Sequence, residues 1–249
     1  MTVTTERRGR VLVVAIDREA KRNAIDQRVA DGIEAALDLL EDDPELWVGV
    51  LTGTSTVFSA GTDLAAGLSP KGERGGEYGV IRRQRTKPLI AAVEGFALGG
   101  GFEIVLACDL VVASAAARFG LPEVKRGLMA ICGGTFRAPR ALPLNLAREM
   151  LLVGDPLPAE RLYQVGVVNR LTEPGQALAG AVELAERICA NGPVAVRASL
   201  AAVEHVVAAD DEAGWAGTET GFAAIVASED MKEGVAAFLA KRAPEWTGR

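Results

Sequence analysis

The sequence contains very little histidine and cysteine, and this scarcity excludes several kinds of catalytic site. Its 249 residues include one histidine, His205, and three cysteines, Cys108, Cys132 and Cys189. A Ser–His–Asp or Cys–His mechanism would have to use His205, whose alanine- and valine-rich surroundings indicate a helix surface. The cysteines are odd in number and far apart, so they indicate neither a disulfide framework nor a zinc site. We therefore predict no metal and expect acid–base chemistry to depend on carboxylates.

Long apolar runs and an excess of positive charge are also missing. No stretch of about 18 apolar residues indicates a membrane span, and the first eight residues lack the apolar core of a signal peptide. With 27 Lys and Arg against 33 Asp and Glu, the net charge is −6. This charge argues against a general nucleic-acid surface, although a local basic patch could hold a phosphorylated ligand. We expect a cytoplasmic protein with no membrane or nucleic-acid partner.

The chain is instead rich in apolar residues, which make up 49% of it and suffice for a sizeable core. Strand and helix patterns alternate as far as about residue 175, and the remainder is helical. This order predicts an α/β core followed by a helical C-terminal part. Between residues 49 and 119 a strand, a short extended piece and a helix recur, which suggests stacked similar turns rather than one open sheet.

Local patterns predict several individual elements. Asp26 is expected to cap a helix over residues 26–41. The glycine-containing stretch 66–79 is expected to form a loop, and the basic segment 80–86 a short helix. A last strand is expected at residues 167–171, and the C-terminal helices are expected at 176–190, 194–209, 211–226 and 228–241.

Three consecutive glycines join an expected strand, residues 89–93, to an expected helix, residues 102–107. Glycine permits dihedral angles denied to other residues and lets another molecule approach closely. The first N–H groups of a helix have no internal partner, so a polarised oxygen placed there would be held. Glu103 lies about one turn into this helix. The alternative is purely structural: close strand–helix packing, with Glu103 complementing the helix dipole. The spacing is not that of a dinucleotide fingerprint.

Two small-residue turns could together form one catalytic site. If the strands leading to Thr62 and Gly100 are neighbours, their two N–H groups could converge on one oxygen as an oxyanion hole. Glu103 and Glu123 lie on different elements and could approach one cavity from different sides, acting on one water as base and acid. Taken alone, Glu123 after Pro122 is more typical of a surface charge.

Several segments resemble motifs of the crotonase, or enoyl-CoA hydratase, superfamily. Residues 58–64, FSAGTDL, are similar to its turn F-[CS]-A-G-x-D-[LI]. Residues 87–103, KPLIAAVEGFALGGGFE, resemble its K-P-x-I-A-A-V-x-G-x-A-x-G-G-G-x-E segment almost position for position. Residues 17–24, DREAKRNA, are similar to its R-P-x-K-x-N-A turn without the proline, and residues 108–110, 119–123 and 244–246 also fit. The resemblance spans nearly the whole chain.

The resemblance implies an α/β fold of the crotonase-like type. Residues 1–190 would form a spiral of ββα turns, and residues 191–249 a helical region for oligomerisation and active-site closure. The family implies a homotrimer, or a hexamer built as a dimer of trimers. It also implies an acyl-CoA thioester substrate and no cofactor beyond the coenzyme A moiety of that substrate.

The resemblance also implies roles for particular residues. Thr62 and Gly100 would supply the oxyanion-hole N–H groups, and Glu103 and Glu123 would be catalytic, because family hydratases have both glutamates whereas isomerases typically keep one. Residues implied to contact coenzyme A or substrate are Lys21, Arg22, Ala24, Ala60, Gly61, Asp63, Leu64, Gly99 and Ile131, with Lys241 and Arg242 as further phosphate-binding candidates. The implied reaction is syn addition of water to a trans-2-enoyl-CoA, giving a 3-hydroxyacyl-CoA, in fatty-acid β-oxidation or related metabolism.

One segment departs from the family pattern G-x-x-P-G-x-G-G. Residues 127–134 are GLMAICGG, with Ala130 in place of proline and Ile131 in place of glycine. The branched side chain could narrow the pocket, shift the water or alter the acyl preference. Alternatives therefore remain open: an isomerase or dehydratase of a specialised acyl-CoA, or a catalytically weak acyl-CoA-binding protein. A spiral-fold serine peptidase fails because His205 lies outside any matching motif.

Overall fold

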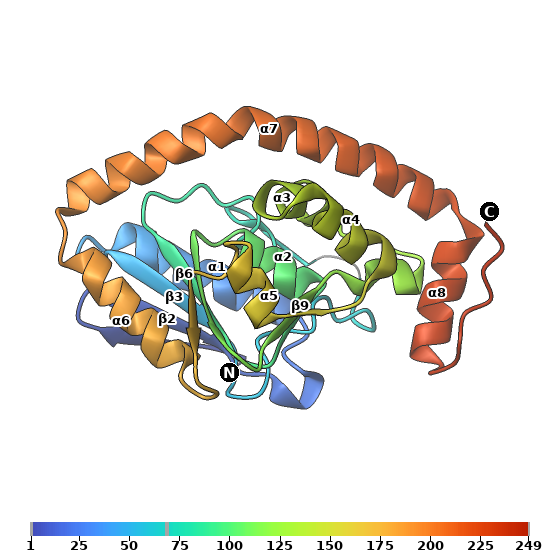
Figure 1. The fold of residues 1–249 in the computed structure, drawn as a ribbon, viewed down its shortest axis with the longest axis horizontal. Helices are drawn as coiled ribbons and strands as arrows, with labels where there is room; N and C mark the ends of the chain where they lie inside the picture. Colours follow the sequence, from blue (N-terminus) through green and yellow to red (C-terminus); the bar gives the residue numbers. More distant parts are fainter. Residues whose placement is uncertain (1, 68–69, 249) are drawn as a thin grey trace.

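A computed structural model, which describes residues 2–67 and 70–248, is built around a six-stranded sheet (Figure 1). The strand order is β1-β2-β3-β6-β8-β11. β1 and β2 are antiparallel, as a hairpin through Gly9 requires, and the other pairs are parallel. The bounds are Val3–Arg8 for β1, Val11–Ile16 for β2, Val48–Thr52 for β3, Leu89–Val93 for β6, Leu110–Ser114 for β8 and Arg170–Thr172 for β11. The last strand therefore begins three residues later than the sequence predicts.

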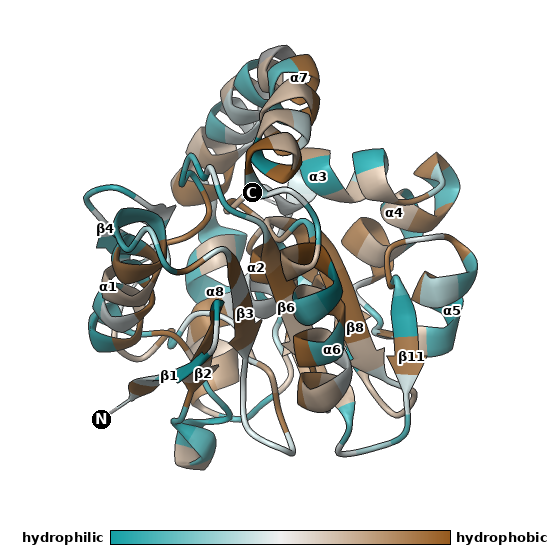
Figure 2. Cartoon of the chain, turned by 90° about the vertical axis from the view of Figure 1, so that its left-hand side faces the viewer, coloured by the Kyte–Doolittle hydropathy of each residue, from teal (hydrophilic) through white to brown (hydrophobic). Residues whose placement is uncertain are grey.

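Helices cover both faces of this sheet. Alternate strand residues point to opposite faces, and because both sets are apolar, both faces must be buried. Val48, Val50 and Ile90 pack with Ala181 and Ala185 of one helix, α6, in one apolar cluster. The alternate residues of the same strands lie in the main core, and the strands β3, β6 and β8 are predominantly apolar in Figure 2. The helices are α1 Gln27–Asp42, α2 Gly100–Leu106, α3 Gly134–Ala141, α4 Leu144–Val153, α5 Ala159–Gln164 and α6 Ala177–Cys189.

A second, smaller sheet stacks beside the first and supports the expected succession of similar turns. Its order is β10-β9-β7, with bounds Leu157–Pro158, Arg118–Gly120 and Phe96–Leu98. A parallel bridge between Ser59 and Ala97 brings the 57–62 segment alongside β7. Segments that follow β3, β6 and β8 thus lie side by side, which brings the turns that follow them together.

The C-terminal part contains two helices, α7 Pro193–Ala227 and α8 Glu229–Leu239. The expected break between helices over 194–209 and 211–226 is wrong. Asp211 instead forms ion pairs with Arg140 and Arg137 of α3, and these pairs anchor one continuous helix to the core. Figure 1 shows α7 arching across the molecule to α8. Among the described residues, no helix combines the length and apolar character needed to cross a membrane.

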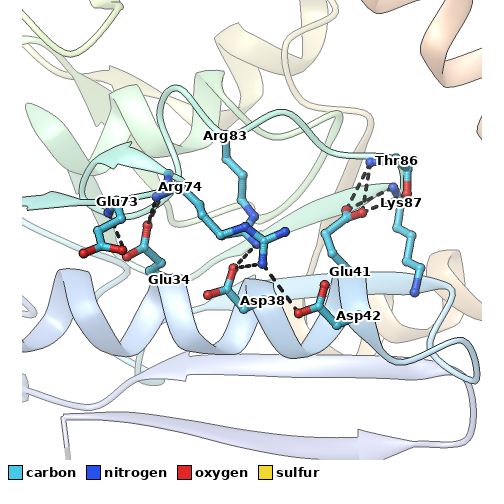
Figure 3. Close-up of polar contacts among 10 residues, drawn as sticks. Glu34, Asp38, Glu41, Asp42, Glu73, Arg74, Arg83, Thr86 and Lys87 are labelled. Atoms are coloured by element: carbon cyan, nitrogen blue, oxygen red, sulfur yellow. Dashed lines mark hydrogen bonds and ion pairs between the residues drawn. The ribbon is translucent and has the colours of Figure 1, made fainter.

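The segment predicted as a helix over 80–86 forms turns instead. Tertiary contacts with α1 override its local preference: the Arg83 guanidinium pairs with Asp38, and the Thr86 amide and hydroxyl donate to Glu41 (Figure 3). The loop expected over 66–79 includes a hairpin of two short strands, β4 Lys71–Gly72 and β5 Gly76–Glu77. Residues 68–69 of this loop lie outside the described part. Asp26 caps α1 as predicted, accepting from the Val29 amide at 3.0 Å.

Candidate active site

The thirteen residues assigned from the sequence to catalysis, the oxyanion hole or substrate contact all line one cavity of about 560 Å³. They are Lys21, Arg22, Ala24, Ala60, Gly61, Thr62, Asp63, Leu64, Gly99, Gly100, Glu103, Glu123 and Ile131. Four segments that are distant in the sequence supply them, and the elements above explain how they meet. The described residues contain no group of three or more His, Cys, Asp or Glu side chains placed to hold a metal.

Hydrogen bonds to Asn23 hold the segment that leads into the Ala60–Thr62 turn. The buried amide of Asn23 donates to the carbonyls of Val57 and Phe58 at 2.9 and 3.1 Å, and Ser59 Oγ donates back to the Asn23 carbonyl at 2.9 Å. Asn23 has φ 53°, a left-handed conformation that asparagine tolerates better than most residues. Sequence patterns alone do not assign Asn23 a function, and its place in the DREAKRNA segment is the one signal they contain.

The Thr62 amide is turned towards the cavity by a parallel bridge with Ile25. Ile25 N donates to Gly61 O at 2.8 Å, and Asp63 N donates to Ile25 O at 2.9 Å. Because these hydrogen bonds use the residues on either side, the intervening Thr62 N–H points away from Ile25. Within residues 2–67 and 70–248, it donates no hydrogen bond to another protein group.

The Gly100 amide opens α2 at the same place. Gly99, with φ 56°, precedes the helix, and Gly100 occupies its first position, where an N–H has no intrahelical acceptor. The two turns touch: a Cβ built on Gly61 would lie only 2.8 Å from Gly100 N. The structure therefore brings the Thr62 and Gly100 turns together, which is the arrangement that a two-donor oxyanion hole requires.

Glu103 projects from the first turn of α2 and is fully enclosed, with 2% of its surface exposed. Its Oε1 accepts hydrogen bonds from the amides of Cys132 and Gly134 at 2.8 and 2.9 Å. Burial raises the pKa of Glu103 to about 7, and the two N–H donors oppose this rise by stabilising the carboxylate. The segment that departs from the family pattern thus holds the Glu103 carboxylate through its backbone.

Glu123 approaches from the opposite side, on the short 3₁₀ helix η2 Pro122–Arg126. Its Oε1 lies 3.0 Å from the position a Cβ on Gly99 would take, and its Oε2 is buried without a hydrogen-bond partner. Burial, followed by the charge of Glu103, raises the pKa of Glu123 to about 8. The surface-charge interpretation of Glu123 is wrong, because this carboxyl group faces the cavity.

The two carboxyl groups titrate as a pair, because, besides burial, a charge on Glu103 raises the pKa of Glu123. Glu103 is the more acidic, because Cys132 and Gly134 donate to its carboxylate, whereas Glu123 Oε2 has no donor. The second ionisation is opposed by repulsion between two enclosed charges. Of the two singly protonated forms, the one ionised at Glu103 and protonated at Glu123 is therefore favoured, and in this form one group can accept a proton while the other gives one.

Positive charges surround the mouth of the cavity. Lys21 and Arg22 are exposed beside it, and Lys241 reaches it from beyond α8. Arg242 is instead held by Glu233 in a bidentate ion pair, with one contact of 2.8 Å, and does not line the cavity. Asp63 lines the cavity, but its carboxylate is paired with Arg18 at 2.9 Å.

The C-terminal helices of the same chain complete the walls with Phe222, Phe238 and Leu239. The Arg126 guanidinium lies over the Phe238 ring, 4.6 Å from its centroid. Gly234 of α8 packs directly on the backbone of Arg126, because a Cβ there would lie 2.2 Å from the Arg126 carbonyl oxygen. α8 therefore covers the element that carries Glu123.

Tyr78 also lines the cavity and was missed from the sequence, because it lies in the patternless stretch 66–79. It is one of two tyrosines in the chain and is 2% exposed. The only available signal was a large aromatic residue placed between Glu77 and Gly79 in an otherwise small and charged loop.

Comparisons with known proteins agree along the whole chain. Residues 6–249 match the family model described as enoyl-CoA hydratase/isomerase. An enoyl-CoA hydratase of Mycobacterium tuberculosis, EchA19, is 40% identical over 98% of this chain and 96% of its own length. The short-chain-enoyl-CoA hydratase of Clostridium acetobutylicum is 34% identical over 96% and 95%. A solved carnitinyl-CoA dehydratase from Mycobacterium avium 104 superposes with a TM-score of 0.93 at 44% identity, covering 100% and 99%.

Proposed function

The chain belongs to the enoyl-CoA hydratase/isomerase family and is a hydratase of enoyl-CoA thioesters, and we propose that Glu103 and Glu123 carry out its hydration step. The crotonase-like fold expected from the sequence is confirmed by the solved structures it matches. One observation carries the catalytic assignment. Two enclosed carboxyl groups face one cavity, beside two touching turns that carry the Thr62 and Gly100 amides.

The proposed role of the Thr62 and Gly100 amides is to hold the thioester oxygen. As water adds to C3, electron density moves through C2 to that oxygen and forms an enolate. A negatively charged oxygen gains more from fixed N–H donors than a neutral carbonyl does, so these amides lower the barrier rather than only binding substrate. Removing one such donor typically costs about 2.7–4 kcal/mol of transition-state stabilisation.

The proton transfers follow from the unequal acidity of the two carboxyl groups. The Glu103 carboxylate accepts a proton from the water as its oxygen bonds to C3, and the protonated Glu123 gives its proton to C2. The product has gained one water in total. A proton shift from Glu103 to Glu123 then restores the starting form. Addition to one face, as two carboxyl groups around one water imply, makes the reaction syn.

A pH profile provides a direct test of this ionisation. We expect kcat/KM to fall below about pH 7, as Glu103 becomes protonated, and above about pH 8, as Glu123 loses its proton. Both the acid and the alkaline limb of a kcat/KM profile report pKa values of the free enzyme. The measurement is hydration of crotonyl-CoA from about pH 5.5 to about pH 9.5, with thermal unfolding recorded across the range to exclude denaturation. A rate that stays flat through this window would contradict the shared-proton assignment.

Coenzyme A phosphates would be held at the basic mouth of the cavity. Lys21, Arg22 and Lys241 are the proposed cations. Arg126 also lines the cavity, but its guanidinium lies over Phe238 and donates to the Pro122 carbonyl, and Arg242 is paired with Glu233. We propose that the reaction uses no cofactor beyond the coenzyme A moiety of the substrate, because both proton transfers and the enolate are provided for by this chain's own groups.

The proposal extends to assembly and setting. Four valine side chains of α7 are exposed to solvent: Val194, Val203, Val206 and Val226. Exposed apolar side chains favour burial against another protein surface, and we propose that further copies of the chain cover them in a homotrimer or a dimer of trimers. We propose that residues 191–249 serve both this contact and the closure of the site, since α7 and α8 contribute walls to the cavity. The proposed setting is cytoplasmic acyl-CoA metabolism such as β-oxidation.

The carnitinyl-CoA dehydratase likeness favours a second candidate, dehydration of a specialised 3-hydroxyacyl-CoA. The same two carboxyl groups would serve this reaction in reverse: Glu123 would remove the C2 proton, and Glu103 would return a proton to the departing hydroxide. Isomerisation is disfavoured, because it moves one proton between carbons and does not need both glutamates.

A chain-length series tests the proposed function. We expect trans-2-enoyl-CoA thioesters to lose their enoyl absorbance on hydration, with the preferred length set in part by Ile131, which lines the cavity. Ile131→Gly restores the residue of the family pattern and should shift the preference towards longer chains. Binding of every thioester without turnover would refute the hydratase proposal for these substrates.

A further inference from the structure

Tyr78 places a phenol hydroxyl against both residues of the proposed oxyanion hole. Its oxygen lies 2.7 Å from Thr62 Oγ1. A Cβ built on Gly100 would lie 2.4 Å from the same oxygen, which therefore sits directly over the Gly100 Cα. Since Cα–Cβ bonds tilt towards the N-terminus of a helix, the phenol oxygen lies on the side of α2 where its free amides point.

The Tyr78–Thr62 pair has one hydroxyl proton that its mutual hydrogen bond does not use. Each hydroxyl carries one proton, and the bond between them engages only one. The phenol also contacts the Cys132 side chain, whose sulfur is a weak acceptor. If Thr62 donates to Tyr78, the phenol proton is available to a stronger acceptor in the cavity. Burial, above all, raises the pKa of Tyr78 well above its ordinary value, and the nearby Glu103 acts in the same direction, so this proton is retained.

The backbone of Tyr78 is held in a conformation that an aromatic residue rarely adopts. Its φ is 57°, in the left-handed region, where a bulky side chain is strained. Such strain persists only where surrounding contacts enforce it, and it concentrates at functional sites. The Tyr78 amide donates to the Pro70 carbonyl at 2.8 Å, which ties the residue into the loop fold.

Carboxylates of α1 supply the enforcing contacts (Figure 3). Glu34 accepts the amides of Glu73, Arg74 and Gly75 at 3.0, 2.7 and 2.7 Å. Further along α1, Asp38 pairs with Arg74 at 2.8 Å and with Arg83. The loop is therefore fastened on both sides of Tyr78, and the phenol is fixed before any ligand arrives.

We propose that Tyr78 is a third oxyanion-hole donor, whose hydroxyl, supported by Thr62 Oγ1, donates a hydrogen bond to the thioester oxygen as it becomes an enolate. This inference rests on the proposed function, because it concerns the same oxygen. A chain of two hydroxyls directed at a developing negative charge strengthens cooperatively. Because the group is already positioned, its contribution appears mainly in kcat rather than in KM.

The test uses acetoacetyl-CoA, a 3-oxoacyl thioester that loses its C2 proton to form an ultraviolet-absorbing enolate. Wild-type protein should lower the apparent pKa of the bound compound, and Tyr78→Phe should raise it back by about one unit or more, a roughly tenfold loss of enolate. Hydration kcat should fall by roughly 10- to 100-fold with KM little changed. Thr62→Val, which keeps the amide, should have a smaller effect, and the double variant should match Tyr78→Phe.

Tyr163→Phe is the matched control, because Tyr163 is the other tyrosine and lies half-exposed on α5. It should leave both readouts unchanged. Tyr78→Phe with wild-type enolate ionisation and kcat would overturn the inference, as would a wild type that leaves acetoacetyl-CoA ionisation unperturbed. If the wild type stabilises the enolate but hydrates no enoyl-CoA, the proposed function fails, while Tyr78→Phe still decides the role of the phenol.

Discussion

Glu103→Gln and Glu123→Gln should each lower kcat for enoyl-CoA hydration by roughly 10²- to 10⁴-fold, the usual contribution of a positioned general acid or base. Each amide keeps the size and polarity of the side chain it replaces but cannot exchange a proton with water or C2. Because the two groups act on one water as a unit, the double variant should lose little more than either single variant. The measurement is steady-state hydration of a trans-2-enoyl-CoA.

A buried carboxyl outside the cavity supplies the control. Glu94 is 8% exposed, and its Oε1 accepts the Ala177 amide at 2.9 Å, an acceptor role that glutamine can also fill. Glu94→Gln should therefore retain near-wild-type kcat. If either cavity variant were equally active, the two-carboxyl mechanism would be wrong.

The same variants should be at least as stable as the wild type, which separates lost chemistry from lost folding. The folded pKa values of Glu103 and Glu123 lie above the ordinary value of 4.5, so folding favours their protonated forms. Their contribution to stability is complete below about pH 4.5 and is lost as the pH rises towards about 7 and 8. Replacement by glutamine removes this loss. The unfolding midpoint of each variant should therefore exceed that of the wild type most clearly above about pH 8.

The sequence points to the residues that we propose as catalytic because they lie in turns whose glycines and carboxylates follow the main strands. Glycine at 61 is required by the close approach of the Gly100 backbone, and glycine at 100 by the close approach of the Tyr78 ring, and both requirements leave a visible pattern. Tyr78 and Asn23 left no such pattern. Their roles depend on side chains that cross between distant segments, Tyr78 to Thr62 and Asn23 to Val57 and Phe58.

Long-range ion pairs explain the elements that were predicted wrongly. Segment 80–86 has helix-compatible residues, but Arg83 and Thr86 are bound to α1, and those contacts determine its path. Near residue 210, consecutive aspartates resemble a helix boundary, yet Asp211 meets two arginines of α3. Local propensity is a weak guide where a charged side chain finds a distant partner.

Gly100→Ala should lower hydration kcat by roughly 10²- to 10³-fold, the scale of losing one oxyanion-hole donor. The added Cβ would lie 2.4 Å from the Tyr78 hydroxyl oxygen and 2.6 Å from its Cζ. The ring has little freedom to retreat, because its loop is fastened to α1 by Glu34 and its side chain is enclosed. The clash must therefore displace the phenol, the Gly100 amide or both. Either displacement weakens the hydrogen bonds donated to the enolate oxygen.

Two comparisons make this expectation specific to the site. Gly217 lies within α7 with no atom within 4 Å of a built Cβ, so Gly217→Ala should keep full activity and gain up to about 1 kcal/mol of stability from helix propensity. Gly100→Ala combined with Tyr78→Phe should be about as slow as Gly100→Ala alone, because Cζ still blocks the Cβ and both changes act on one oxygen. Wild-type kcat in Gly100→Ala would mean that the ring moves aside freely, and a fixed phenol at the oxyanion hole would then be untenable.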